Sequence, residues 1–231
     1  MKNLVVLTGA GVSAESGIST FRDAGGLWEG HDIMEVASPQ GWERNPELVL
    51  DFYNKRRAQL KTVEPNEAHH IIAGLERNFQ VTVITQNVDD LHERAGSSSV
   101  LHLHGELRKV RSTVNPDDIA HHEDDLHLGD CCAAGHQLRP HIVWFGEDVP
   151  AMSKAIDITS KADLFLVVGT SLQVYPAAGL IDYTPINCQH FLVDPNPALS
   201  SKNGLTVIEE VASTGMRKIE ELLFLHHDKK D

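Results

Sequence analysis

Short apolar runs rich in β-branched residues recur along the chain, and segments with helical character separate them. The runs cover residues 4–7, 81–85, 100–103, 141–145, 164–168, 191–193 and 206–208. Strands that alternate with helices in this way imply a mostly parallel sheet with helices on both faces. The sequence therefore predicts an α/β fold, with a last helix over residues 216–225.

Two segments break this alternation. Residues 25–64 contain no strand signal, although residues 46–61 have helical character. Residues 108–138 are polar, rich in His and Asp, and nearly free of apolar runs. We interpret both segments as insertions that together form a small domain. The large domain then consists of residues 1–24, 65–107 and 139–231.

Composition narrows the class of protein. With 231 residues, 41% of them hydrophobic, the chain can bury a sizeable core. The formal net charge of −13 argues against a nucleic-acid partner, because affinity for phosphate backbones comes from clustered Lys and Arg. We find no secretory signal and no apolar run long enough to cross a membrane, so we expect a cytoplasmic protein with no membrane partner. The three cysteines, of which Cys131 and Cys132 are adjacent, agree with a reducing compartment.

A glycine-rich motif follows the first apolar run. Gly9, Gly11 and Ala14 fit the pattern G-x-G-x-x-A, in which the glycines let a strand turn tightly into a helix and approach a diphosphate. This motif predicts a dinucleotide such as NAD as the cofactor. A hydride-transfer oxidoreductase should next show a second strand that ends in Asp or Glu about twenty residues on. The next convincing strand begins only near Val81, so a hydride-transfer enzyme is disfavoured.

Five spaced motifs carry a family resemblance. They are GAGVSAESGISTFR (9–22), TQNVDDLHERAG (85–96), HLHGEL (102–107), RPHIVWFGE (139–147) and GTSLQVYPAA (169–178). In this order they resemble the sirtuin family, and most closely its bacterial class III, or desuccinylase-type, members. The resemblance implies a Rossmann-like large domain and a smaller lobe built from two insertions. It also implies NAD-dependent removal of acyl groups from the lysines of partner proteins, with release of nicotinamide and 2'-O-acyl-ADP-ribose.

The resemblance also assigns cofactor residues. The diphosphate would bind at Gly9, Ala10, Gly11 and Ala14. The mobile cofactor loop would contribute Phe21 and Arg22, and Trp28 would also bind the cofactor. The nicotinamide and its ribose would bind at Gln86, Asn87, Val88 and Asp89. Further contacts would come from Gly169, Thr170, Ser171, Asp194, Pro195, Asn196 and Ala212. For Asp194, a contact with the ribose hydroxyls and an Asp-Pro turn after a strand are both open.

The reaction requires a base that makes a ribose hydroxyl nucleophilic, and histidine suits this task because its pKa lies near neutrality. His104 lies directly before Gly105 at the end of an apolar strand, and His102 faces the same side of that strand. Spacing alone allows either residue to be the base or a structural histidine. The H-G pattern of the resemblance selects His104. We assign His69, His70 and His92 to structure.

Substrate contacts are predicted at two places. An extended peptide would pair beside residues 143–147 and contact Val143, Phe145 and Gly146, although one face of this strand must also pack in the core. Tyr53 and Arg56 lie three residues apart and so share a helix face. Their spacing alone is typical of a solvated charged face. The Y-x-x-R pattern, however, resembles the sirtuins that accept acidic acyl chains, and Ala24 would leave room for such a chain.

The expected metal content departs from many sirtuins, which carry two C-x-x-C pairs in the small domain. Here the first pair is missing, with Ser112 near its place, and only Cys131-Cys132 remains of the second. We therefore expect no metal and a zinc-free small domain. A substitute site that combines these cysteines with His121, His127 or His136 is the alternative.

A different function for the same site also remains open. An NAD-binding sensor or a mono-ADP-ribosyltransferase without efficient deacylation would use the same cofactor residues. The appearance of 2'-O-acyl-ADP-ribose in step with nicotinamide would distinguish the deacylase from these.

Overall fold

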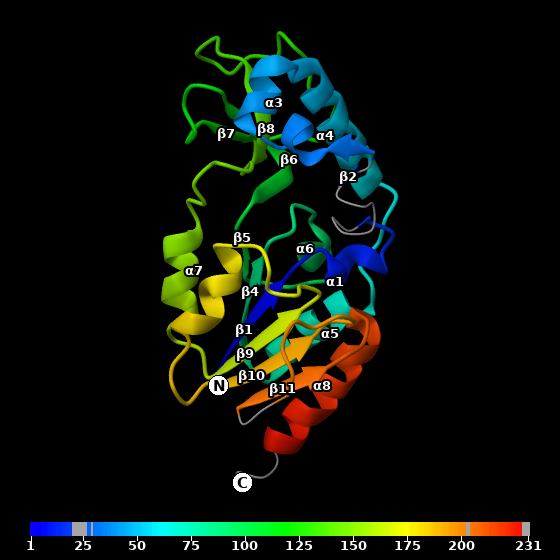
Figure 1. Ribbon diagram of the computed structural model, residues 1–231, viewed down its shortest axis with the longest axis vertical. Helices are drawn as coiled ribbons and strands as arrows, with labels where there is room; N and C mark the ends of the chain where they lie inside the picture. Colours follow the sequence, from blue (N-terminus) through cyan, green and yellow to red (C-terminus); the bar gives the residue numbers. More distant parts are fainter. Residues whose placement is uncertain (20–26, 29, 202–203, 228–231) are drawn as a thin grey trace.

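The computed structural model describes residues 1–19, 27–28, 30–201 and 204–227. Its centre is a six-stranded sheet in which every neighbouring pair is parallel (Figure 1). The strand order is β11 (Leu205–Ile208), β10 (Gln189–Val193), β9 (Leu164–Val168), β1 (Asn3–Thr8), β4 (Gln80–Thr85) and β5 (Val100–His102). The expected α/β fold with a mostly parallel, Rossmann-like sheet is confirmed.

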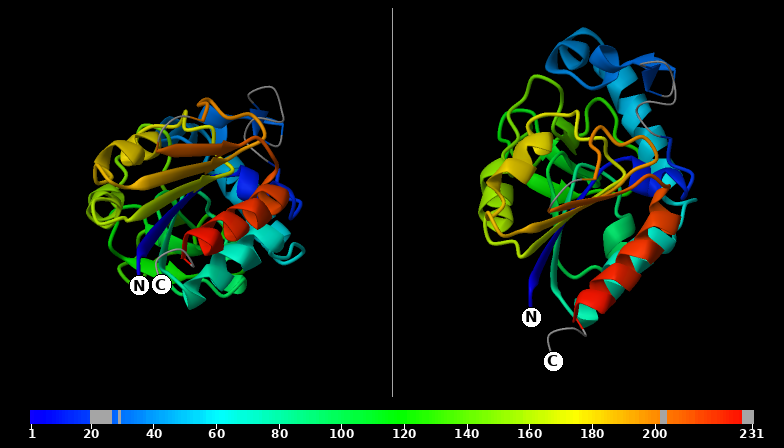
Figure 2. Two further views of the ribbon diagram at one scale, coloured as in Figure 1. Left: turned by 90° about the horizontal axis from the view of Figure 1, so that it is seen from below. Right: turned by 60° about the horizontal axis from the view of Figure 1, so that its bottom comes forward.

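Both faces of this sheet are buried, which explains why the strands read as continuous apolar runs. On β1, Leu4 and Val6 join the core under α5 (Glu67–Gly74) and α8 (Ala212–His227). Val5 and Leu7 point the other way, into the core under α7 (Met152–Thr159) and η2 (Ala177–Tyr183). Figure 2 shows these two layers on opposite faces of the sheet.

A smaller lobe lies at one end of the molecule, at the top of Figure 1. It contains an antiparallel sheet in the order β7 (Ile119–His121), β6 (Gly105–Ser112) and β8 (Leu138–Ile142). Its helical part consists of α2 (Ile33–Val36), α3 (Pro39–Arg44) and α4 (Pro46–Leu60), with the short strands β2 (Leu27–Trp28) and β3 (His31–Asp32). The remaining elements, α1 (Gly11–Ala14), η1 (Leu75–Arg77) and α6 (Leu91–Arg94), belong to loops around the parallel sheet.

The helix α4 begins and ends close to the expected residues 46–61. Asn45 caps its amino terminus by accepting a hydrogen bond from the Leu48 N–H, and Pro46 occupies the first turn. The side chain of Arg57 is buried and donates to the carbonyl of Leu107 at 2.9 Å, which ties α4 to β6.

The strand expected over residues 141–145 differs in the structure. β8 ends at Ile142 and belongs to the antiparallel sheet of the small lobe. Beyond it the chain turns, because Gly146 has a φ of +91° and the Glu147 N–H donates to the carbonyl of Trp144 at 3.0 Å. β6 also starts at Gly105, inside the expected large domain, so the division into two domains stays a proposal.

Among the described residues, no helix is both long and apolar enough to cross a membrane.

Candidate functional site

Two of the predicted cofactor loops touch each other at the carboxyl edge of the parallel sheet. The Gly11 N–H donates to the carbonyl of Gly169 at 2.9 Å. A Cβ atom at Gly9 would lie 2.6 Å from the Cβ of Thr170, so only glycine allows this approach. Gly169 has a φ of +65°, which also favours glycine. The turns at residues 9–11 and 169–171 therefore form one backbone cradle.

This cradle contains a buried hydroxyl with an unmet hydrogen bond. Ser171 is 2% exposed, and its Oγ atom has no hydrogen-bond partner in the part of the chain that the structure describes. A buried polar atom of this kind usually binds a ligand or water. Together with the close-packed glycines and the first turn of α1, it fits the diphosphate end of a dinucleotide.

The loop that follows β4 is fixed by three consecutive carbonyl groups. Gln86 accepts a hydrogen bond from His104 Nδ1 at 3.0 Å, and Asn87 accepts one from His102 Nδ1 at 3.0 Å. The carbonyl of Val88 accepts from the Leu107 N–H at 2.8 Å. These bonds bring the predicted nicotinamide residues next to the two candidate bases.

The two histidines differ in what their second ring nitrogen does. Since a carbonyl can only accept, the bond to Gln86 keeps the proton of neutral His104 on Nδ1 and leaves Nε2 as the basic atom. We find no hydrogen bond from the described residues to that Nε2 atom. Burial lowers the pKa of His104, which keeps the ring neutral at physiological pH.

His102, in contrast, is bonded at both nitrogens, because its Nε2 lies 2.8 Å from Glu93 Oε1. Burial alone would lower the pKa of His102, but the hydrogen bond and charge of Glu93 outweigh burial and raise it. An imidazole that binds a carbonyl at one side and a carboxylate at the other is suited to hold a loop, not to accept a further proton.

The predicted ribose residues belong to a buried polar cluster, which we call the ribose hub: Ser13, His69, Asn87 and Asp89. Ser13 Oγ donates to Asp89 Oδ2 at 3.0 Å and accepts from Asn87 Nδ2 at 3.1 Å. It also lies 3.5 Å from His69 Nε2. Burial raises the pKa of Asp89 to about 6, against the opposing hydrogen bonds from Leu91 and Ser13.

At the expected adenosine end, Asp194 forms a turn after β10, which is one of its two open interpretations. Its Oδ1 atom accepts a hydrogen bond from the Asn196 N–H at 2.8 Å, as in an Asx turn, and the side chain is buried. Pro195 and Asn196 are exposed, and Ala212 is buried at the start of α8. A contact of these residues with ribose stays a prediction.

The predicted acyl residues lie on α4. Tyr53 is fully buried, and its hydroxyl accepts a hydrogen bond from Trp144 Nε1 at 3.1 Å. Arg56 is half-buried, with its guanidinium carbon 5.8 Å from the centre of the Phe52 ring. Trp28, predicted to bind the cofactor, packs edge-on against Phe52 at 4.9 Å between ring centres. Phe21, Arg22 and Ala24 lie outside the described residues.

The segment predicted to pair with the peptide, residues 143–147, links Tyr53 to the candidate base His104. The Val143 N–H donates to the carbonyl of His104 at 2.9 Å, and the next residue, Trp144, bonds Tyr53. The Phe145 N–H donates to the carbonyl of Ala37 at 2.9 Å. Phe145 is 41% exposed, so its ring is not simply part of the core.

The family follows from comparison with known proteins. A family model described as the Sir2 family matches residues 9–176, which is most of the chain. The chain belongs to the Sir2 family. An NAD-dependent protein deacylase of Helicobacter pylori is 60% identical to this Sir2-family chain over 195 residues, which cover 84% of the chain and 83% of the relative.

Further relatives agree over nearly the full length. An NAD-dependent protein deacylase of Bacteroides thetaiotaomicron is 53% identical over 230 residues, covering 96% of this chain and 98% of that protein. The crystal structure of a Sir2 homolog in complex with NAD superposes with a TM-score of 0.87 at 39% identity, covering 97% of this chain and 90% of the other. The resemblance to sirtuins seen in the motifs is confirmed.

Sequence reasoning missed part of the polar network in this Sir2-family site. Thr8 Oγ1 lies 2.9 Å from His92 Nε2 and donates to Thr85 Oγ1 at 2.8 Å. Thr85 Oγ1 in turn accepts from the Asn87 N–H at 3.0 Å. The available signal was a threonine at the carboxyl end of each of two apolar strands. The hydrogen bonds of Ser13 were missed as well. Ser13 lies inside the glycine motif, at a position where the motif by itself indicates no polar role.

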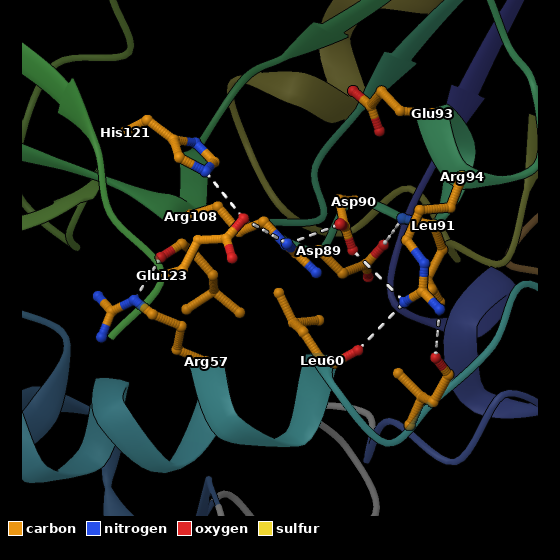
Figure 3. Close-up of polar contacts among 12 residues, drawn as sticks. Arg57, Leu60, Asp89, Asp90, Leu91, Glu93, Arg94, Arg108, His121 and Glu123 are labelled. Carbon is orange, nitrogen blue, oxygen red and sulfur yellow. Dashed lines mark hydrogen bonds and ion pairs between the residues drawn. The ribbon is translucent and has the colours of Figure 1, made fainter. Parts of the chain in front are cut away.

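Ion pairs and hydrogen bonds connect the segment after the predicted nicotinamide residues to the small lobe (Figure 3). Asp90 pairs with Arg108 at 2.8 Å, and Arg108 pairs with Glu123 at 2.9 Å. Arg94 donates to the carbonyl groups of Leu60 and Val63 at 3.1 and 2.8 Å. These contacts connect the two ends of α6 with β6 and with the end of α4.

Near the position of the missing first cysteine pair, hydrogen bonds to Ser112 stabilise the loop. Ser112 Oγ accepts from the N–H groups of Val114 and Asn115 at 3.2 and 3.3 Å. Cys131 forms an isolated bridge with Gln137, and both Cys131 and Cys132 are unpaired. Within residues 1–19, 27–28, 30–201 and 204–227, no group of three or more His, Cys, Asp or Glu side chains could hold a metal. The zinc-free small domain stays a prediction.

Proposed function

We propose that this Sir2-family chain is an NAD-dependent protein-lysine deacylase that removes succinyl and malonyl groups as well as acetyl groups, with His104 as its base. Its substrates are acylated proteins, and its products are nicotinamide and 2'-O-acyl-ADP-ribose. The relatives named as NAD-dependent protein deacylases, at 60% and 53% identity, support the activity. Its proposed location is the cytoplasm, since three unpaired cysteines suit a reducing compartment.

The observation that carries the proposal is the continuous link from the base to the acyl residues. His104 bonds Gln86 through Nδ1 and Val143 through its carbonyl, and the neighbouring Trp144 bonds Tyr53. His104, Gln86 and Tyr53 are therefore held within one hydrogen-bonded unit. Such a unit suits a reaction that joins a cofactor ribose to a lysine acyl group.

NAD is the cofactor, and it supplies a ribose carbon that becomes electrophilic as nicotinamide leaves. Gly9, Ala10, Gly11 and Ala14 would hold its diphosphate together with Gly169, Thr170 and Ser171. Asn87 and Asp89 would hold the nicotinamide ribose, with Gln86 and Val88 beside them. Asp89, Asn87 and Ser13 already bond one another in a buried cluster, so their donors and acceptors are oriented before a ligand arrives.

In the proton step, Nε2 of His104 accepts the proton of a ribose hydroxyl, which makes that oxygen nucleophilic. The Gln86 carbonyl accepts the Nδ1 proton at 3.0 Å and so stabilises the ring once it becomes charged. Because burial lowers the pKa of His104, the ring is neutral and ready to accept at pH 7.

The peptide would pair with the groups of residues 143–147 that the fold leaves available. The N–H groups of Val143, Trp144 and Phe145 already donate to His104, Glu147 and Ala37. Peptide pairing would therefore use groups such as the Val143 carbonyl and the Gly146 N–H. Main-chain pairing of this kind requires little side-chain identity, so protein specificity should be broad.

Acidic acyl chains would be recognised by Tyr53 and Arg56, which share a face of α4. A carboxylate only accepts hydrogen bonds, and these residues offer a phenol proton and a planar guanidinium fork. Removing a hydrogen bond to a charged group costs roughly 1.5–3 kcal/mol, which corresponds to about ten- to hundredfold in kcat/KM.

The test compares succinyl-lysine and acetyl-lysine peptides of the same sequence, with 2'-O-acyl-ADP-ribose and nicotinamide measured by mass spectrometry. Arg56→Met should depress desuccinylation about ten- to hundredfold and deacetylation little. Lys55→Met is the matched control, because Lys55 is the adjacent cation but is exposed and paired with Asp51 at 2.7 Å. Equal loss of both activities in Arg56→Met would show that Arg56 holds the helix, and release of nicotinamide without the acylated product would reject deacylation.

A further inference from the structure

The hydrogen bond between Trp144 and Tyr53 has a fixed direction. Trp144 Nε1 lies 3.1 Å from the Tyr53 hydroxyl, and both side chains are buried, at 2% and 0% exposure. An indole N–H can only donate, so the Tyr53 oxygen must accept. The phenol therefore keeps its own proton to donate, and we find no acceptor for that proton among the described residues.

The indole is held firmly enough to impose this direction. The guanidinium carbon of Arg139 lies 3.2 Å from the centre of the Trp144 ring, and the Trp42 ring packs against it at 5.7 Å between ring centres. Glu147 accepts hydrogen bonds from Arg139 Nη1 at 2.7 Å and from the backbone N–H of Trp144 at 2.8 Å, which fixes Arg139 over the ring and the backbone from which the ring projects. The ring cannot turn its N–H away from Tyr53 without losing its stacking against Arg139 and Trp42.

We propose that Trp144 is a specificity-determining positioning residue, whose indole N–H commits the Tyr53 hydroxyl to donate its proton to the carboxylate of an acidic acyl chain. This inference rests on the proposed function, because it concerns how the same acyl site recognises its substrate. It assigns Trp144 a role separate from core packing and from main-chain pairing with the peptide.

The chemistry of the phenol explains the effect. A phenol proton lies near the ring plane and has two favoured orientations, one on each side of the oxygen. Trp144 occupies an acceptor position of that oxygen, so the proton is directed away from the indole. A carboxylate that enters the site then meets a donor that is already oriented, which removes an ordering cost from binding.

The state of Tyr53 is compatible with this role. Burial raises the pKa of Tyr53 far above neutrality, so the hydroxyl keeps its proton at working pH. An acetyl group has no carboxylate to receive this proton. The consequence of losing the indole N–H should therefore appear in the ratio of desuccinylation to deacetylation.

The test is a double-mutant cycle on the full chain, with succinyl-lysine and acetyl-lysine peptides of one sequence. Trp144→Phe keeps an aromatic ring in the core and removes the N–H. It should lower the ratio of kcat/KM for desuccinylation over deacetylation about three- to tenfold, the size expected for one neutral hydrogen bond. In a Tyr53→Phe background the same change should leave the ratio where Tyr53→Phe alone puts it.

Trp42→Phe is the matched control, because it alters the neighbouring indole of the same cluster without touching Tyr53. If Trp144→Phe fails to fold, site-specific benzothienylalanine at position 144 keeps the ring shape without the N–H and gives the same test.

A fall of equal size in the Tyr53→Phe background, or equal loss of both activities, would overturn the inference. An unchanged ratio in Trp144→Phe together with a large fall in Arg56→Met would reject the role of Trp144 and leave the proposed function standing. If neither variant changes the ratio, the acidic-acyl function itself is wrong.

Discussion

In the ribose hub, Ser13, Asn87 and Asp89 are buried and bond mainly to one another. At the lobe tip, which we define as residues 112–137, Ser112 and Gln137 instead bond mainly to the backbone. Gln137 accepts from the Gly129 N–H at 2.8 Å and donates to the carbonyls of His127 and Asp130, each at 3.1 Å. Both regions are polar, but in the lobe tip the side chains bond mainly to backbone groups of their own loops, whereas in the hub Asp89 alone adds such a bond, from the Leu91 N–H.

This difference indicates that the hub serves ligand binding and that the lobe tip serves stability. A buried carboxylate such as Asp89 is costly to hold without an ion pair, and that cost is tolerated where a ligand will use the group. Backbone groups satisfied by a side-chain amide stabilise a loop and leave nothing for a ligand. We therefore expect changes in the hub to affect activity most, and changes in the lobe tip to affect stability.

The largest effect should come from the base beside the hub. His104→Ala should lower deacylation on the order of a hundredfold or more, because a positioned general base contributes that much. The fold and much of the NAD affinity should remain, since the lost side chain makes one described hydrogen bond, to Gln86. Turnover of NAD and acyl-peptide, with calorimetry of NAD binding, measures both. Near-wild-type turnover would point to His102 as the base.

The second effect concerns Asp89 and pH. Burial raises its pKa to about 6, so the folded state holds the proton more tightly than the unfolded state, whose pKa is near 3.8. Stability is therefore lost as pH rises from about 4 to 6, and the penalty above pH 6 amounts to about 3 kcal/mol. Asp89→Asn should unfold at higher temperature than the wild type at pH 7.5 but not at pH 4, while NAD binding weakens.

Thermal unfolding at several pH values measures the expected gain in stability, and NAD affinity measured in parallel shows the expected loss of binding. The asparagine can accept from the Leu91 N–H and donate to Ser13. The Ser13 proton then loses its acceptor, because His69 Nδ1 accepts from the Asn66 N–H and His69 Nε2 therefore donates to Ser13, so the gain in stability is smaller than the full penalty. If Asp89→Asn is destabilised equally at pH 4 and 7.5, the carboxylate is a structural acceptor and the contrast between the regions is weaker than we infer.

A smaller effect is expected at the lobe tip. Gln137→Ala removes the bonds to Gly129, His127 and Asp130 and should lower the free energy of unfolding by about 1–2 kcal/mol. Amides of residues 127–137 should exchange hydrogen faster, while kcat/KM stays near the wild-type value. Gln189→Ala is the control, because this glutamine is exposed on β10. A large loss of activity without a loss of stability would place the lobe tip in the catalytic machinery.

The smallest expected effect is from metal removal. In the lobe tip, Ser112 and Gln137 accept hydrogen bonds from loop N–H groups, where a zinc site would otherwise hold the loops. A chelator should therefore leave the Tm unchanged, and elemental analysis should find less than one zinc per chain. Stoichiometric zinc that is lost together with stability would show that Cys131 or Cys132 forms a substitute site.

The fold was predictable from the sequence to the extent that burial is two-sided. Strands such as residues 164–168 are covered on both faces, so they appear as contiguous apolar runs that alternate with helices. The small lobe was less predictable, because β7 is exposed and β6 has a half-buried face with charged residues such as Arg108 and Lys109. The end of β8 at Ile142 depended on a turn at Gly146 that no periodicity reveals.

Sequence alone determined the class of fold, the cofactor motif and the set of candidate bases, because each depends on residue types at short, fixed spacing. The tertiary structure decided how His104 differs from His102, since that difference lies in whether Glu93 reaches the second ring nitrogen. It also decided that Trp144 meets Tyr53, from segments 91 positions apart in the chain. Hydrogen-bond partners of this kind depend on distances of a few tenths of an ångström between distant segments, and composition and spacing do not encode those distances.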